Sequence, residues 1–150
     1  MPGWLVDTNV WLAAVFTTHP LHQVAREAVQ QATPVEPAVF CRATQLSFLR
    51  LSSTPTLLKA YGAEGLTNRD ALVALHALLA LRQVSVREEP RGTLALWQAM
   101  SALDSASPKV WMDAYLAAFA ISGGLRLLTL DQDFRNFVPR GLDLALLQQR

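Results

Sequence analysis

Short apolar segments alternate with longer segments along most of the chain. The short ones are bounded by turn-forming residues, which is typical of buried strands. The expected strands are residues 4–7, 35–40, 84–88, 125–131 and 142–147. Pro37 lies inside the second of these and cannot donate a backbone hydrogen bond, so we expect residues 35–40 to be an edge strand.

The longer segments carry the apolar spacing and the terminal signals of helices. The expected helices are residues 10–16, 20–32, 42–51, 68–82, 92–103 and 108–122. Asn68 is the expected cap of the fourth, and Gly123-Gly124 ends the last, which is apolar nearly all round and is expected to be buried. Alternating strands and helices predict an α/β fold, a three-layer α/β/α sandwich around a mainly parallel sheet.

Composition narrows the class of protein. The chain has 150 residues, of which 51% are apolar and 17% charged, so we expect one folded domain spanning residues 1–150. Cys41 is the only cysteine, the first residues lack the basic start of a signal peptide, and no apolar run is long enough to cross a membrane. We therefore expect a cytoplasmic protein that is not held in a membrane.

Carboxylates interrupt three of the most apolar stretches. Asp7 ends WLVD, Asp131 and Asp133 follow LRLLTL, and Asp113 lies within VWMDAYLAAFAI. In parallel sheets, ligands bind beyond the carboxyl ends of the strands, where Asp7 and Asp131 would lie together. Alanines one and two turns after Asp113 would let its helix approach the sheet.

A divalent cation explains why several carboxylates would converge in a poorly solvated place. Carboxylates in one cleft repel one another, and oxygen ligands are those that Mg²⁺ and Mn²⁺ prefer. Each acid alone has a simpler explanation: Asp7 as a turn or helix cap, and Asp133 as a cap of the following segment. Three independent caps explain the whole pattern less well than one site.

The charge balance fits an anionic substrate. There are 13 Lys and Arg against 12 Asp and Glu, and setting aside the four candidate acids leaves 13 against 8. An acidic focus on an otherwise basic molecule is suited to a cation that acts on a polyanion. Ordinary scatter of charge would give the same totals.

Four motifs together resemble the PIN-domain nucleases, and specifically the VapC-type ribonuclease toxins of toxin–antitoxin systems. The motifs are LVDTNVWLAA, TQLSFLRL, MDAYLAAFA and LLTLDQDF, in this order along the chain. The resemblance implies an endoribonuclease that hydrolyses RNA with water activated by Mg²⁺ or Mn²⁺. It also implies a homodimer and a cognate VapB-like antitoxin.

The resemblance assigns roles to single residues. Asp7, Asp113 and Asp131 match the metal-binding, catalytic aspartates, while Asn9 and Thr129 match polar positions that support them. Gln45 stands where the family commonly has Glu and can offer an oxygen without a charge, so Asp133 becomes a further candidate ligand, and one or two ions remain possible. Arg42 and Arg50 flank Gln45 and are candidates for contacts with RNA phosphates or with the antitoxin.

Other classes of protein fit less well. An aspartyl-nucleophile phosphatase would have a second acid where this chain has Asn9, and a phosphorelay receiver would use one phosphoacceptor aspartate with a late lysine, whereas the only lysines are Lys59 and Lys109. The alternative that remains is a PIN-like module, weakened in catalysis at Gln45, that binds RNA or protein.

Overall fold

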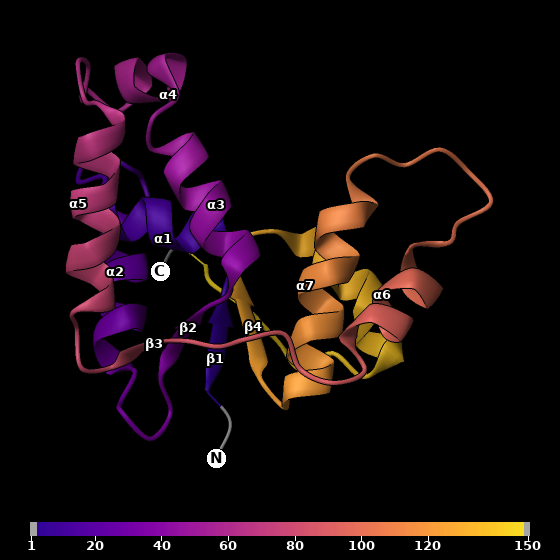
Figure 1. Cartoon of the computed structure of the whole chain (residues 1–150). Helices are drawn as coiled ribbons and strands as arrows, with labels where there is room; N and C mark the ends of the chain where they lie inside the picture. Colours follow the sequence, from indigo (N-terminus) through magenta and orange to yellow (C-terminus); the bar gives the residue numbers. More distant parts are fainter. Residues whose placement is uncertain (1–2, 149–150) are drawn as a thin grey trace.

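The computed structural model describes residues 3–148, in which five strands form one parallel sheet with the order β3-β2-β1-β4-β5 (Figure 1). All four neighbouring pairs are parallel. The strands are β1 (Trp4–Val6), β2 (Ala38–Phe40), β3 (Val84–Val86), β4 (Arg126–Thr129) and β5 (Leu144–Leu146).

Helices cover both faces of this sheet. They are α1 (Thr8–Val15), α2 (His22–Gln31), α3 (Arg42–Leu51), α4 (Pro55–Ala60), α5 (Asn68–Leu79), α6 (Thr93–Ser101), α7 (Val110–Gly123) and the 3₁₀ helix η1 (Gln132–Arg140). In Figure 1 the helices α1 to α5 lie on one side of the strands, and α6 and α7 lie on the other. The predicted three-layer α/β/α sandwich is confirmed.

Alternation along the strands divides the core in two. Leu5 and Leu127 point to the face that packs against α7, whereas Val6 and Leu128 point to the face that packs against α1 and α3. On the second face the rings of Trp11 and Phe40 stack with centroids 4.0 Å apart. β1, β2 and β5 contain only apolar residues, as expected of strands in a sheet that is covered on both faces.

β2 is not at the edge of the sheet, where Pro37 led us to expect it. It pairs with β1 on one side and with β3 on the other, so it is an interior strand and the prediction of an edge strand was wrong. Pro37 precedes the strand, and therefore its missing N–H removes nothing from the ladder. Its carbonyl oxygen accepts a hydrogen bond from the backbone N–H of Trp4 at 2.8 Å.

Several helix ends also differ from expectation. The cap of α5 is Thr67, not Asn68, because the hydroxyl of Thr67 accepts from the N–H of Asp70 and the Asp70 carboxylate accepts from the N–H of Thr67. Pro55 begins α4, a helix that the sequence did not indicate, whereas α3 has already ended at Leu51. Helix α7 begins at Val110 and has Trp111 55% exposed, so it is not buried all round.

The order of the strands determines where a ligand would bind. The chain runs outward from β1 through β2 to β3, and then returns to the other side of β1 to form β4 and β5. The connections after β1 and β4 therefore leave the sheet in opposite directions, which opens a crevice at their carboxyl ends. Within residues 3–148, no helix is both long and apolar enough to span a membrane.

Candidate active site

Asp7 lies at this crevice because it directly follows β1 and caps α1. Its backbone is extended, and its Oδ1 accepts from the N–H of Thr8 at 2.8 Å. Its Oδ2 accepts from the hydroxyl of Thr129 at 2.7 Å. Asp7 thus caps α1 with Oδ1, as the simpler explanation predicted, while its Oδ2 contacts Thr129 on the neighbouring strand.

Thr129 connects the two strand ends. It is the last residue of β4 and is fully buried. Its hydroxyl donates to Asp7 and accepts from the N–H of Asp131 at 3.0 Å. One side chain therefore fixes the positions of both aspartates.

Asn9 and Asp131 complete this edge. The side-chain oxygen of Asn9 accepts from the N–H of Leu130 at 3.3 Å, which ties the start of α1 to the end of β4. Asp131 caps η1 by accepting from the N–H of Asp133 at 2.9 Å. The cap of the segment after β4 is therefore Asp131 rather than Asp133.

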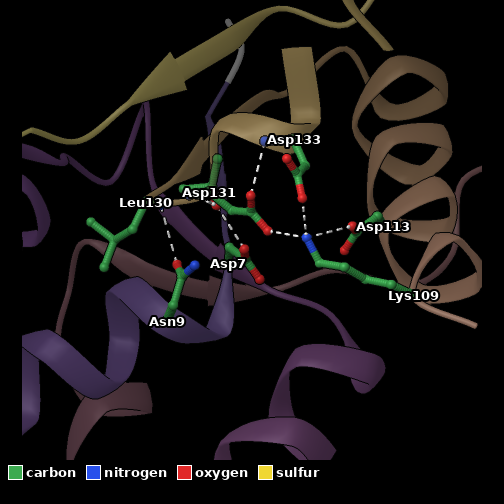
Figure 2. A network of polar contacts seen from close by, with 8 residues as sticks. Asp7, Asn9, Lys109, Asp113, Leu130, Asp131 and Asp133 are labelled. Carbon is green, nitrogen blue, oxygen red and sulfur yellow. Dashed lines mark hydrogen bonds and ion pairs between the residues drawn. The ribbon is translucent and has the colours of Figure 1, made fainter. Parts of the chain in front are cut away.

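Lys109 lies at the centre of the acidic cluster, which sequence reasoning missed (Figure 2). Its Nζ donates to Asp131 Oδ2 at 2.6 Å and to Asp133 Oδ2 at 2.7 Å. The same nitrogen lies 3.5 Å from Asp113 Oδ2, one turn along the chain. In the sequence, the spacing of four residues between Lys109 and Asp113 was the only sign of an ion pair, and nothing there indicated the contacts with Asp131 and Asp133.

The carboxylates experience different electrostatic surroundings. Burial raises the pKa of Asp7, and the hydrogen bonds from Thr129 and Thr8 offset this only in part. Burial also raises the pKa of Asp113, against the opposing charge of Lys109. For Asp131, burial is outweighed by the hydrogen bond from Lys109 and the N–H of Asp133, so its pKa is lowered.

The remaining candidates lie on α3. Gln45 is buried in the helix that follows β2, at the same edge of the sheet, and its Oε1 accepts from Arg42 at 3.3 Å. Arg50 lies in the last turn of α3 and lines a separate cavity against α5. Arg42 therefore contacts Gln45, but within residues 3–148 no hydrogen bond or ion pair joins Arg42, Gln45 or Arg50 to the aspartates of the cluster.

A cavity of about 490 Å³ opens beside the cluster. Lys109, Asp113 and Asp133 form its charged end. Apolar side chains from α6, α7 and η1 line the rest, together with Asn136 and Arg140. A substrate could therefore reach the carboxylates from this side.

The donor set suits a hard divalent cation, but its present arrangement is that of an ion-pair cluster. All the acidic ligands are carboxylates, which Mg²⁺ and Mn²⁺ prefer, and the cluster already surrounds one positive charge, the Lys109 ammonium. Within residues 3–148, no three His, Cys, Asp or Glu side chains are placed to hold a metal ion as they stand. The Lys109 nitrogen lies 2.6–2.7 Å from the carboxylate oxygens of Asp131 and Asp133, whereas Mg²⁺ binds such oxygens at about 2.0–2.1 Å, so a bound cation would need them closer together.

Comparison with known proteins gives a consistent result. Residues 4–138 match the model of the PIN domain. Ribonuclease VapC41 from two strains of Mycobacterium tuberculosis is 45% identical over 144 residues, covering 95% of this chain and 97% of that protein.

Solved structures share the fold. VapBC2 from Rickettsia felis, bound to a DNA fragment from its promoter, superposes with a TM-score of 0.66 at 12% identity, covering 97% of this chain and 98% of the other. Mycobacterium tuberculosis VapC20, described as a Sarcin-Ricin loop cleaving toxin, has a TM-score of 0.61 at 19% identity, covering 93% and 96%. With the domain match and the identity to VapC41, these findings show that the chain belongs to the PIN domain family, among the VapC proteins.

Proposed function

We propose that this protein is a metal-dependent endoribonuclease, the toxin of a toxin–antitoxin pair, with its active site at the carboxyl edge of β1 and β4. One observation carries the proposal: Asp7, Asp113 and Asp131, from three separate segments, gather at the crevice where the strand order reverses. Its support from relatives is the 45% identity to a protein named as a ribonuclease.

The proposed roles follow from the contacts. Asp7, Asp113 and Asp131 would hold Mg²⁺ or Mn²⁺, with Asp133 as a further ligand. The bound cation would supply an acidified water and would offset negative charge on the reacting phosphate. Thr129 orients Asp7 through its hydroxyl, and Asn9 holds the end of β4 in place through Leu130.

The RNA would approach through the cavity between α7 and η1. Arg140 and Asn136 stand on its wall and can donate hydrogen bonds to phosphate and base oxygens. Arg42 is engaged with Gln45 but has donors left for a phosphate. We assign a phosphate contact to Arg42, whereas Arg50 faces a different cavity and is better placed for a protein partner.

Digestion of RNA by the purified protein tests the proposal. We expect cleavage with Mg²⁺, none with EDTA, and products with 5′-phosphate and 3′-hydroxyl ends. Asp113→Asn should abolish cleavage. Asp143→Asn is the matched control, because Asp143 pairs with Arg126 at the opposite edge of the sheet. Cleavage that persists in EDTA, or in the Asp113→Asn variant, would refute the assignment.

Gln45 favours one alternative, a PIN-like module that binds RNA or protein without cleaving it. Gln45 is buried at the acidic edge and adds no charge there. The same digestion distinguishes the two functions: the alternative predicts a shift of labelled RNA in a gel with no cleavage at any Mg²⁺ concentration.

We also propose a cytoplasmic homodimer that binds a VapB-like antitoxin. Two groups of exposed apolar side chains support two protein contacts: Leu46, Leu72 and Val73 on α3 and α5, and Leu94, Trp111 and Met112 on α6 and α7. The Rickettsia felis VapBC2 structure, which shares the fold, is a toxin–antitoxin complex. Light scattering should give twice the chain mass, and co-expression of the neighbouring antitoxin gene should relieve toxicity; a strict monomer would exclude the dimer.

A further inference from the structure

Lys109 is an unusual residue for its position in the fold. It stands at the N-terminus of α7, adopts helical backbone angles and makes no side-chain capping bond. The N-terminus of a helix favours negative charge, so a lysine there gains nothing from the helix. Its only polar partners among residues 3–148 are the three carboxylates of Asp113, Asp131 and Asp133.

The Lys109 ammonium uses the oxygens that a cation would need. Asp131 Oδ2 and Asp133 Oδ2 both accept from it, and Asp113 Oδ2 faces it (Figure 2). A divalent cation must bring such oxygens closer together than an ammonium allows. The two cations therefore cannot share these ligands.

The ammonium is also free to leave. The Lys109 side chain is 57% exposed and lies on a flexible four-carbon stem. It borders the cavity through which RNA would approach. Moving it into that cavity requires no change in the fold and breaks pairs that solvent already screens.

We propose that Lys109 is a built-in counter-ion of the acidic cluster, which neutralises the carboxylates in the metal-free protein and is displaced when a divalent cation binds. This inference rests on the proposed function in one respect, that the cluster binds such a cation. Lys109 therefore lowers the affinity for the cation while it stabilises the protein without it.

Titration of the metal-free full-length protein with Mn²⁺ by calorimetry, without RNA, tests the competition. Lys109→Met removes the charge and keeps most of the side-chain length. We expect Mn²⁺ to bind the variant at least about tenfold more tightly, because a competing unit charge close to the ligands is gone. Lys109→Arg should stay near the wild-type affinity. Lys59→Met, at the other lysine of the chain and exposed on α4, should change nothing.

Thermal melting in EDTA gives an independent readout. Lys109→Met should melt at a lower temperature than the wild type, since the carboxylates lose their counter-ion, and Mn²⁺ should raise the melting temperature of this variant more than that of the wild type. Equal or weaker Mn²⁺ binding by Lys109→Met, or no binding by either protein, would overturn the proposal. Tighter Mn²⁺ binding without RNA cleavage would uphold it and refute the proposed function instead.

Discussion

Asp7 and Asp131 follow neighbouring parallel strands at one edge of the sheet. The surroundings of the two carboxylates nevertheless shift their pKa values in opposite directions. At the β1 end, Asp7 is half-buried, its side-chain hydrogen-bond donors within residues 3–148 are the neutral groups of Thr8 and Thr129, and its pKa is raised by burial. At the β4 end, Asp131 is paired with Lys109, and its pKa is lowered. Without a cation, the charge of Asp7 at the β1 end therefore destabilises the folded state, whereas the charge of Asp131 at the β4 end is already balanced by Lys109.

This difference indicates which end a cation would serve most. Asp113 resembles Asp7 in having a raised pKa, although it faces the same ammonium as Asp131. A divalent cation would stabilise the charged forms of Asp7 and Asp113, whose pKa values are raised, and would replace Lys109 as the partner of Asp131. Substitutions that change one of the two carboxylates at a time test this difference.

The largest effect should be on activity, where the two ends must behave alike. If both carboxylates bind one cation, Asp7→Asn and Asp131→Asn should each lower RNA cleavage by more than about a hundredfold, since even residues that only orient metal ligands cost 10–100-fold. Cleavage of a fluorogenic RNA at saturating Mg²⁺ measures this. Full activity in either variant would remove that end from the site.

Loss of the hydroxyl that joins the two ends should destabilise the fold. Thr129→Val keeps the shape of the side chain but leaves Asp7 Oδ2 without a donor and the N–H of Asp131 without an acceptor. We expect a loss of about 1–3 kcal/mol in the free energy of unfolding, measured in urea. Thr56→Val, at an exposed position on α4, is the control. An unchanged unfolding midpoint for Thr129→Val would show that the hydrogen bonds of the Thr129 hydroxyl contribute nothing to stability.

The two ends should respond in opposite directions when the metal-free protein is melted. A raised pKa means that the folded state holds the proton of Asp7 more tightly than the unfolded state does. Stability is therefore lost as pH rises from the usual aspartate range through the shifted pKa of Asp7. Asp7→Asn removes this loss and should raise the melting temperature at neutral pH by a few degrees.

Asp131→Asn should lower the melting temperature, because it breaks the pair with Lys109. Differential scanning fluorimetry in EDTA at pH 4.5 and 7.5 measures both variants. The advantage of Asp7→Asn should shrink at the lower pH. Shifts of the same sign for the two variants at neutral pH would contradict the comparison.

The smallest expected effect concerns Gln45. Gln45→Glu adds an anionic ligand at the same edge and should tighten Mn²⁺ binding several-fold. The gain is limited because Arg42 already donates to this side chain. Calorimetric titration beside the exposed control Gln31→Glu measures it. No tightening would place Gln45 outside the ligands of the cation.

The sequence predicted the features that depend on local pattern. Short apolar runs indicated the strands, and Asp7 and Asp131 were expected at one edge because each ends such a run. Their proximity is confirmed by the pairing of β1 with β4 and by the shared contact with Thr129. Their role as metal ligands stays a prediction.

The sequence could not predict features that depend on distant partners. Pro37 suggested an edge strand, but the neighbours of β2 are decided by connections elsewhere in the chain. The reach of Lys109 to Asp131 and Asp133 spans more than 20 residues and depends on how α7 packs beside η1. No local pattern records a contact of that kind.

Diffraction from crystals soaked in Mn²⁺ would decide whether the acidic edge is a cation site. Anomalous scattering should show a peak bounded by Asp7, Asp113 and Asp131, with the Lys109 side chain moved away from Asp131. A protein that cleaves RNA with Mn²⁺ but shows no anomalous peak at these residues would contradict the assignment of this edge as the active site.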